Sequence, residues 1–223
     1  MVAQRLSVIV PALNEAAGIR AALEALAPLR RAGYEVILVD GGSSDGTPEL
    51  AAGLCDRVLR TARGRGMQMN VGAGAATGDV LLFLHADTRF PPGGEELIFN
   101  GTKDHLWGRF DVEIDSSHPF LKVVAWAMNL RSRLTGIATG DQAIFVRREA
   151  FRGFPEVALM EDVAFSAAMR RRGRPACLRG RVVTSGRRWE ARGVLRTIVL
   201  MWCLRLMYFL GVREESLARL YKK

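Results

Sequence analysis

The sequence predicts an α/β fold, in which a Rossmann-like, mostly parallel central sheet is flanked by helices and followed by an apolar C-terminal helix. Two observations predict it. Short apolar runs alternate with helical patterns through the first half of the chain, as they do in strand–helix–strand units. The chain also has 223 residues, of which 49% are hydrophobic, and this is enough to bury one large core.

Four strands and three connecting helices are expected in the first half of the chain. The apolar runs stop at turn or capping residues: Asp40 ends the run EVILVD, and GGSSDGT then forms a turn that leads into a helix at Thr47. The strands are expected at residues 6–12, 35–40, 57–61 and 79–87. The helices are expected at residues 14–31, from Thr47 onwards, and at 66–78.

The second half is less regular but contains the same kinds of element. GRFDVEI, residues 108–114, alternates like a half-exposed strand, and QAIFVRR, residues 142–148, is a further strand. A helix over 119–136 begins at a proline and ends at a glycine. The helix over 161–173 carries acidic residues first and arginines last, as the helix dipole favours.

The segment 194–211 is the most apolar part of the chain. Arg196 and Arg205 interrupt it, and no uninterrupted run approaches the roughly 20 residues that cross a bilayer. We expect a helix that packs on the domain, pairs with a second subunit as a homodimer, or lies on a membrane surface. Residues 1–190 are expected to form one domain and residues 191–223 a helical extension.

The net charge indicates which kinds of molecule the protein binds, and the cysteines indicate in which cellular compartment it lies. The formal net charge is +9, almost all of it from arginine, and a basic surface suits an anionic partner. The run MRRRGR, residues 169–174, has no interleaved aromatic residues, so no nucleic-acid partner is expected. Three scattered cysteines without metal-binding spacing favour a reducing location, either free in the cytoplasm or at the inner face of the membrane. The first apolar run is too short for a signal peptide.

Acidic residues stand at several predicted strand ends and at one helix start. They are Asp40, Asp87, Asp141, Glu161 and Asp162. Each alone is explained equally well as a helix cap or a loop residue. Because the carboxyl ends of parallel strands meet at one edge of a sheet, we expect these side chains together to border a single cleft.

Five segments in order carry a family resemblance: SVIVPALNEAAGI, EVILVDGGSSDGT, LLFLHADT, GDQAIFVRR and MEDVAFSAAMRRRG. They resemble the inverting glycosyltransferases of family 2, which have the GT-A fold, over roughly residues 6–190. More narrowly, FLHADT and GDQ resemble a bacterial subgroup linked to arsenosugar biosynthesis. The resemblance implies transfer of a sugar from a UDP- or GDP-sugar to an unknown acceptor hydroxyl, with inversion. Residues of about 1–90 would bind the nucleotide sugar, and those of about 91–190 the acceptor.

The resemblance also implies which residues hold the donor. The segment after the first strand and the acid that ends the second strand contact the nucleoside, and RGRGMQMN lines the donor site, where arginines neutralise a diphosphate. The residues implied are Pro11, Asn14, Glu15, Asp40, Arg63, Arg65 and Asn70.

A divalent cation, Mn²⁺ or Mg²⁺, is implied at the end of the fourth strand. Family members carry Asp-x-Asp there, and this chain has Asp87 with His85 in place of the first aspartate. Imidazole suits Mn²⁺ better than Mg²⁺, which prefers oxygen ligands. Three roles stay open for His85: a weak ligand of the metal, a hydrogen-bond donor to a group that itself binds the metal, or a hydrogen-bond partner of the sugar or ribose.

Asp162 matches the general base of the family, and Glu161 beside it would raise its pKa through like charge. On the acceptor or diphosphate side the resemblance places Gly140, Asp141, Gln142 and, from a faint Gln-x-x-Arg-Trp likeness, Arg188 and Trp189. A nicotinamide dehydrogenase is disfavoured because VPALNE supplies no glycines after the first strand. The alternative is a nucleotide- or glycan-binding domain without transferase activity.

Overall fold

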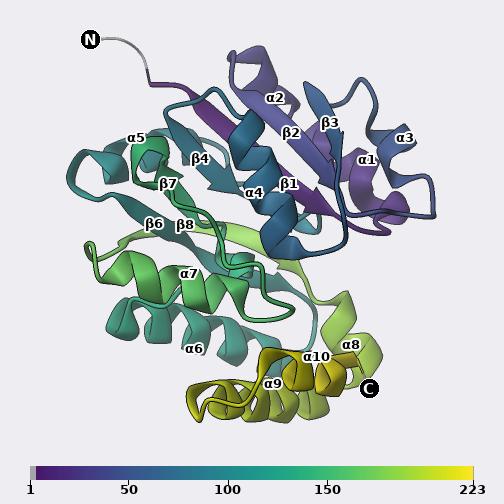
Figure 1. Cartoon of the computed structure of the whole chain (residues 1–223), viewed down its shortest axis with the longest axis vertical. Helices are drawn as coiled ribbons and strands as arrows, with labels where there is room; N and C mark the ends of the chain where they lie inside the picture. The colour runs from purple at the N-terminus through teal and green to yellow at the C-terminus, as the bar shows by residue number, and fades with distance from the viewer. Residues whose placement is uncertain (1–3, 223) are drawn as a thin grey trace.

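The computed structural model describes residues 4–222, apart from the side chains at positions 188, 214, 215 and 222. Within these residues an eight-stranded sheet has the order β3-β2-β1-β4-β7-β6-β8-β5 (Figure 1). The strands of the first half are β1 (Leu6–Ala12), β2 (Glu35–Asp40), β3 (Arg57–Arg60) and β4 (Val80–Phe83). The others are β5 (Thr88–Arg89), β6 (Trp107–Asp115), β7 (Phe145–Arg147) and β8 (Ala176–Ser185).

The sheet is parallel through its first four strands. β1 pairs in parallel with β2 and β4, and β2 pairs in parallel with β3. β7 then runs antiparallel between β4 and β6, while β6 and β8 are again parallel. All seven residues of β1 are buried, as expected for a parallel strand that is covered on both faces. The predicted α/β class with a mostly parallel sheet is therefore confirmed.

Helices cover both faces of the sheet. One core contains side chains from α1 (Ala16–Ala25), α2 (Ala27–Arg31), α3 (Thr47–Ala51) and α5 (Gly94–Asp104). The core on the other face contains side chains from α4 (Arg65–Ala75) and α7 (Glu161–Arg170). The small residues of α4 let it lie close to the sheet, since a Cβ on Gly72 would be 2.5 Å from Ile9 Cγ2.

Three predicted elements are bounded differently, for local reasons. The helix expected over 14–31 is divided at Leu26 into α1 and α2, because Pro28 has no backbone N–H to continue the helical hydrogen bonds. The strand expected over 79–87 ends at Phe83, which leaves its last four residues outside the strand. The segment expected to begin a strand at 142 instead has a single turn of 3₁₀-helix, Gly140–Gln142, ahead of β7. Ala143 has φ 46° and cannot belong to a strand.

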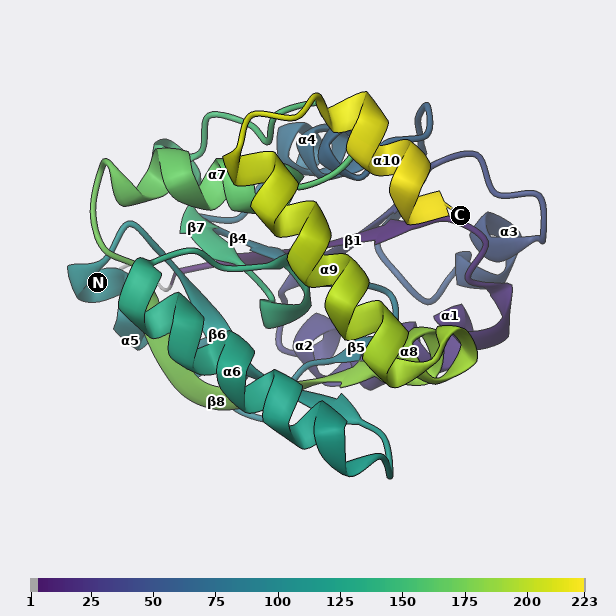
Figure 2. The ribbon, with the colours of Figure 1, turned by 90° about the horizontal axis from the view of Figure 1, so that it is seen from below.

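The chain after β8 is helical, with α8 (Arg187–Arg192), α9 (Val194–Phe209) and α10 (Glu214–Lys222). Figure 2 shows α9, α10 and the long α6 (Pro119–Thr135) on the same side of the molecule. Leu204 of α9 and Leu217 of α10 are buried in one cluster with Met160 and Val163 at the start of α7. The tail therefore packs on the domain through one side. In the part of the chain that the structure describes, no helix combines the length and the apolar character needed to cross a membrane.

Candidate active site

A pocket of about 1410 Å³ opens where the sheet meets the C-terminal helices. One side consists of the residues that follow β1 and β4 and the start of α4, and the other side consists of α6, α9 and α10. This is the edge at which parallel strands end, as the strand-end acids predict. Small-molecule sites usually measure roughly 300–1,000 Å³, so this pocket has room for two substrates at once.

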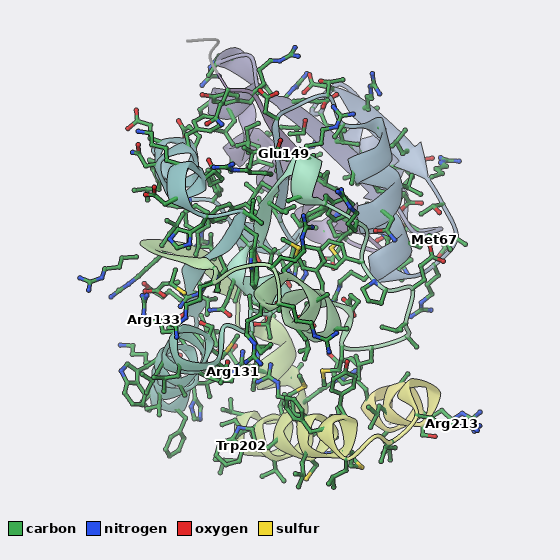
Figure 3. All side chains as sticks on the ribbon, turned by 60° about the vertical axis from the view of Figure 1, so that its left-hand side comes forward. Met67, Arg131, Arg133, Glu149, Trp202 and Arg213 are labelled. Carbon is green, nitrogen blue, oxygen red and sulfur yellow. The ribbon has the colours of Figure 1, made fainter. Side chains whose placement is uncertain are left out.

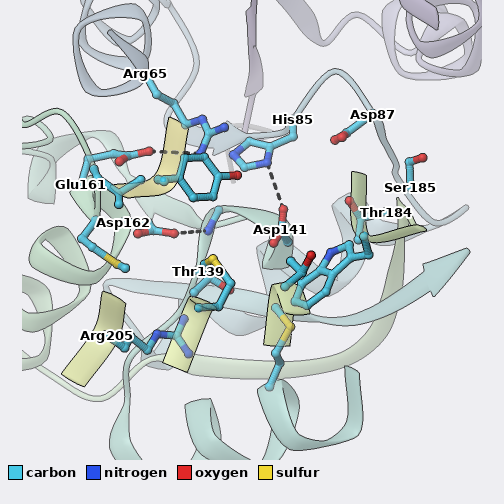
Figure 4. Close-up of a pocket in the computed structure, with 18 of the residues that line it drawn as sticks. Arg65, His85, Asp87, Thr139, Asp141, Glu161, Asp162, Thr184, Ser185 and Arg205 are labelled. Atoms are coloured by element: carbon cyan, nitrogen blue, oxygen red, sulfur yellow. Dashed lines mark hydrogen bonds and ion pairs between the residues drawn. The ribbon is translucent and has the colours of Figure 1, made fainter. Parts of the chain in front are cut away.

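Glu161 and Asp162, the first two residues of α7, line the pocket side by side (Figure 4). Glu161 is buried, and its Oε1 lies 3.4 Å from Arg65 Nη1 at the start of α4. Asp162 Oδ2 accepts a hydrogen bond of 2.7 Å from the backbone N–H of Gly140. The sequence thus brings two helix starts and the GDQ segment to one point.

The surroundings of Asp162 make it a stronger proton acceptor than an ordinary aspartate. Burial and, after it, the Glu161 carboxylate raise the pKa of Asp162 to about 6, while the Gly140 N–H lowers it. Burial lowers the pKa of the Arg65 guanidinium, but the Glu161 and Asp141 carboxylates raise it by more. At neutral pH the pocket therefore contains an ionised Asp162 of raised basicity beside a charged Arg65.

The GDQ segment connects Asp162 with His85. A Cβ on Gly140 would lie 2.4 Å from His85 Nε2, so the close approach of the imidazole requires glycine. On its other side, His85 Nδ1 lies 3.3 Å from Asp141 Oδ1 (Figure 4). Gly140 and Asp141 therefore hold the His85 ring between them.

Asp87 faces the pocket from the turn after β4 (Figure 4). In the described part of the chain, its side chain accepts one long hydrogen bond, 3.4 Å from Thr88 Oγ1. His85 differs, because its Nδ1 lies against Asp141 and its Nε2 is buried against Gly140 without a hydrogen-bond partner among the described atoms. Residues 4–222 contain no group of three or more His, Cys, Asp and Glu side chains that would enclose a metal ion.

Five of the seven residues expected at the donor line the pocket: Pro11, Asn14, Glu15, Arg63 and Arg65. Asp40 and Asn70 do not. The Asp40 carboxylate accepts hydrogen bonds of 3.0 Å from the backbone N–H groups of Gly42 and Ser43. The Asn70 amide donates to the carbonyl of Phe154 and accepts from its N–H. Both side chains shape loops beside the pocket, and their contact with the nucleoside stays a prediction.

Of the residues expected on the acceptor or diphosphate side, Gly140, Asp141 and Trp189 line the pocket. Gln142 is fully buried, donates to Ser132 Oγ and accepts from the Thr139 N–H, so that it stabilises the 3₁₀ turn. The side chain of Arg188 lies outside the described part of the structure.

Three further pocket residues were missed by the sequence prediction: Arg131 of α6, Arg205 of α9 and Tyr221 of α10. Nε and Nη2 of Arg131 are buried without a hydrogen-bond partner among the described atoms, and burial lowers the pKa of this guanidinium against the attraction of Asp162. Arg205 extends from α9 into the pocket (Figure 4). In the sequence, Arg205 stands out as an arginine within a mostly apolar helix, but this pattern does not reveal which part of the molecule the side chain faces.

Residues 7–153, more than half of the chain, match the sequence family described as Glycosyl transferase family 2. The chain belongs to this family. Curated relatives named PGL/p-HBAD biosynthesis glycosyltransferase, from Mycobacterium bovis and Mycobacterium tuberculosis, are 40% identical to it over 94 residues. The match covers 39% of this chain and 37% of each relative, so the chain matches well under half of the length of these proteins.

Solved structures share the fold of this family 2 glycosyltransferase. Glucosyl-3-phosphoglycerate synthase from M. tuberculosis, in complex with Mn²⁺ and UDP-glucose, has a TM-score of 0.58 at 19% identity, over 81% of this chain and 70% of that one. PcManGT from Pyrobaculum calidifontis, in complex with GDP-Man and Mn²⁺, has a TM-score of 0.60 at 24% identity, over 81% and 56%. TarS from S. aureus, in complex with UDP-GlcNAc, has a TM-score of 0.66 at 20% identity, over 81% and 58%. The predicted GT-A fold is confirmed.

Proposed function

We propose that this enzyme transfers a sugar from a UDP- or GDP-sugar to an acceptor hydroxyl, with inversion and with Asp162 as general base. The family supports a nucleotide-sugar donor, and structures of the same fold contain UDP-glucose, GDP-Man and UDP-GlcNAc. The position and the pKa of Asp162 are the observations that support its assignment as the general base. Asp162 lines the pocket, its pKa is raised to about 6, and the Gly140 N–H fixes one of its oxygens.

In this mechanism Asp162 takes the proton of the acceptor hydroxyl while that oxygen bonds to the anomeric carbon and the bond to the diphosphate breaks. A positioned base contributes about 10²–10⁴-fold to such a step, most effectively when its pKa lies near the working pH. Glu161, held by Arg65, supplies the like charge that keeps the pKa of Asp162 there. One displacement with one base inverts the anomeric centre and does not need the acid and nucleophile of a retaining glycosidase.

The diphosphate would lie between Arg65 and Asp87. Arg65 is a charged guanidinium in the pocket beside the proposed base, suited to bind phosphate oxygens. The Asp87 carboxylate, which accepts only a long hydrogen bond among the described atoms, would hold a Mn²⁺ or Mg²⁺ ion. Such an ion, when bound, neutralises charge on the leaving diphosphate. Because both ring nitrogens of His85 face protein atoms, we assign His85 to positioning Asp141 rather than to ligation.

The proposed reaction requires an acceptor molecule with a free hydroxyl. The FLHADT and GDQ motifs favour arsenosugar biosynthesis, whereas the curated relatives are named for PGL/p-HBAD biosynthesis and match over a limited segment. Trp189, on the side of the pocket formed by the C-terminal helices, is the residue we assign to acceptor contact. We also propose a cytoplasmic location, because the three cysteines are all unpaired.

Calorimetric titration with UDP and with GDP, each with and without Mn²⁺, tests the donor class. Release of the nucleoside diphosphate from UDP- and GDP-sugars in water then tests turnover without knowledge of the acceptor. Binding of one nucleotide, together with release that Asp162→Asn abolishes, supports the proposal. Binding without release from any donor favours the nucleotide-binding form of the alternative, a nucleotide- or glycan-binding domain without transferase activity. Failure of both nucleotides to bind would contradict the proposed transfer and favour the glycan-binding form.

A further inference from the structure

The exposed large apolar side chains of this enzyme gather on one surface. Among the described residues with such side chains, all except Leu97 belong to α6, α9, α10 or the turn between the last two. We call the part formed by α6 and α9 the α6–α9 surface. Its members are Phe120, Val123, Trp126, Leu130, Leu134, Leu195, Val199, Trp202, Leu206 and Phe209. Figure 2 looks onto this side of the molecule.

These side chains recur every three or four residues, so each helix presents one continuous apolar side to the outside. On α9, Trp202 is 72% exposed and Phe209 69%, whereas Leu204 is fully buried beneath them. On α6, Trp126 is 64% exposed, whereas Leu121 is fully buried. Both helices therefore bury one apolar side in the domain and expose a second. Monomeric proteins rarely expose contiguous apolar areas of this kind without a binding role.

The two helices of this surface carry charges of a single sign. The ranges 119–135 and 194–209 contain five basic residues, Lys122, Arg131, Arg133, Arg196 and Arg205, and no acidic residue. Arg131 and Arg205 line the pocket, whereas Lys122, Arg133 and Arg196 are exposed. Arg213 is exposed in the turn after α9 and precedes Glu214 and Glu215 in the sequence. Figure 3 shows Trp202 and Arg213 pointing away from the body of the molecule. Apolar side chains bordered by cations match the headgroups and acyl boundary of an anionic membrane. A second copy of this chain would bring like charges together across a symmetric interface.

The pocket opens on the same surface. Five of its members line the pocket and are also exposed: Phe120, Val123, Val199, Trp202 and Leu206. A flat partner that covers α6 and α9 would therefore lie over the mouth of the pocket.

We propose that the α6–α9 surface docks on an anionic membrane, with Trp126, Trp202 and Phe209 inserted among the headgroups and Lys122, Arg196 and Arg213 against lipid phosphates. The sequence leaves both a membrane contact and a homodimer open for residues 194–211. The proposal favours the membrane contact and adds α6 to the contacting surface. The pocket then faces the lipid. Only if the proposed function also holds does it follow that the acceptor hydroxyl belongs to an amphipathic molecule in the headgroup layer.

Co-sedimentation of the full chain with vesicles tests the docking. Vesicles of phosphatidylcholine alone are compared with vesicles that also contain phosphatidylglycerol, at low and high salt. We expect at least about tenfold stronger binding to the anionic vesicles, lost at high salt because ionic screening removes the cationic contribution. Trp126→Ser/Phe209→Ser removes two exposed side chains that do not line the pocket, and Leu97→Ser on α5 is the matched control.

Strong binding of the wild type and the control, with loss in the double variant, supports the proposal. No binding of the wild type to anionic vesicles overturns it, as does binding that the double variant retains. A dimer that the double variant dissociates, without vesicle binding, overturns it in favour of a second copy. Calorimetry with UDP or GDP on the same proteins separates this result from the proposed function, because nucleotide binding does not depend on the membrane.

Discussion

Gly140 donates its backbone N–H to Asp162 Oδ2 at 2.7 Å and, with the space left by its missing side chain, accommodates the ring of His85. The proposed base and the imidazole that contacts Asp141 are therefore positioned by one residue. The ring fills the space between Gly140 and Asp141.

Gly140→Ala is expected to disturb both neighbours. The new Cβ would lie 2.4 Å from His85 Nε2, and overpacking of this kind costs about 1–3 kcal/mol of folding free energy. Thermal unfolding measures the loss, and release of nucleoside diphosphate measures the accompanying fall in turnover. In the Gly140→Ala background, His85→Ala removes the clash and is expected to restore stability. A double variant as unstable as the single one would show that the clash is not the cause.

Asp162→Asn is expected to lower turnover by about 10²–10⁴-fold while nucleotide binding is kept, since the amide retains the size of the side chain but cannot accept a proton. Turnover is followed by nucleoside diphosphate release and binding by calorimetry. Glu149→Gln is the control, because Glu149 is 73% exposed and lies outside the pocket. Turnover of Asp162→Asn near the wild-type rate would remove Asp162 as the base.

The raised pKa of Asp162 predicts the pH dependence of turnover. The base must be ionised, so turnover is expected to be half-maximal near pH 6, to reach its plateau about one to two pH units above, and to fall below it. The measurement is kcat/KM for donor hydrolysis between about pH 4.5 and 8. Because Arg65 lowers the pKa of Asp162, Arg65→Gln is expected to move the inflection to higher pH. A wild-type rate that is unchanged down to pH 5 would contradict the prediction.

Asp87 and His85 are expected to differ in metal dependence. Asp87→Ala should abolish the tightening of UDP or GDP binding by Mn²⁺, because Asp87 provides the open carboxylate. His85→Ala should keep that tightening, since Nδ1 of His85 lies against Asp141 and its Nε2 is buried. Titrations with and without Mn²⁺ measure both. If His85→Ala removes the Mn²⁺ effect and Asp87→Ala does not, the two roles are the reverse of those proposed.

Arg131→Met is expected to raise the stability of the protein without ligand. Two guanidinium nitrogens of Arg131 are buried without a partner among the described atoms, and each such group costs about 1–3 kcal/mol. Methionine keeps much of the apolar contact of the side chain. The unfolding temperature is the measurement, with Lys122→Met at an exposed position of the same helix as the control. A lower unfolding temperature for Arg131→Met would show that these nitrogens are satisfied by water.

Much of the fold could be predicted because parallel strands buried on both faces are continuous apolar runs. β1 and β2 lie at the predicted residues for this reason. β8 was missed because three arginines and a glycine near or within it break the alternation, and only part of it is buried. The helix α5 was missed because Gly101 and Thr102 weaken its pattern. The apolar helix expected over 194–211 is α9, and the rest of the expected helical extension contains α10.

Four of the five acids expected at one cleft line the pocket, namely Asp87, Asp141, Glu161 and Asp162, whereas Asp40 is held by the backbone of its own loop. The residues contributed by distant helices could not be predicted. Arg131 and Arg205 face the pocket only because α6 and α9 fold back over it, and no short-range pattern encodes that placement. Gln142 lies outside the pocket lining and bonds within the loop that carries its motif, so its contact with a ligand stays a prediction.

The cluster of Met160, Val163, Leu204 and Leu217 lies between the outermost helices and the start of α7. Asp162 stands between the first two of these residues in the chain, so the packing of Leu204 in this cluster supports the helix start that carries the proposed base. One layer of side chains therefore separates the proposed lipid-contacting helix from the residue proposed to take the proton.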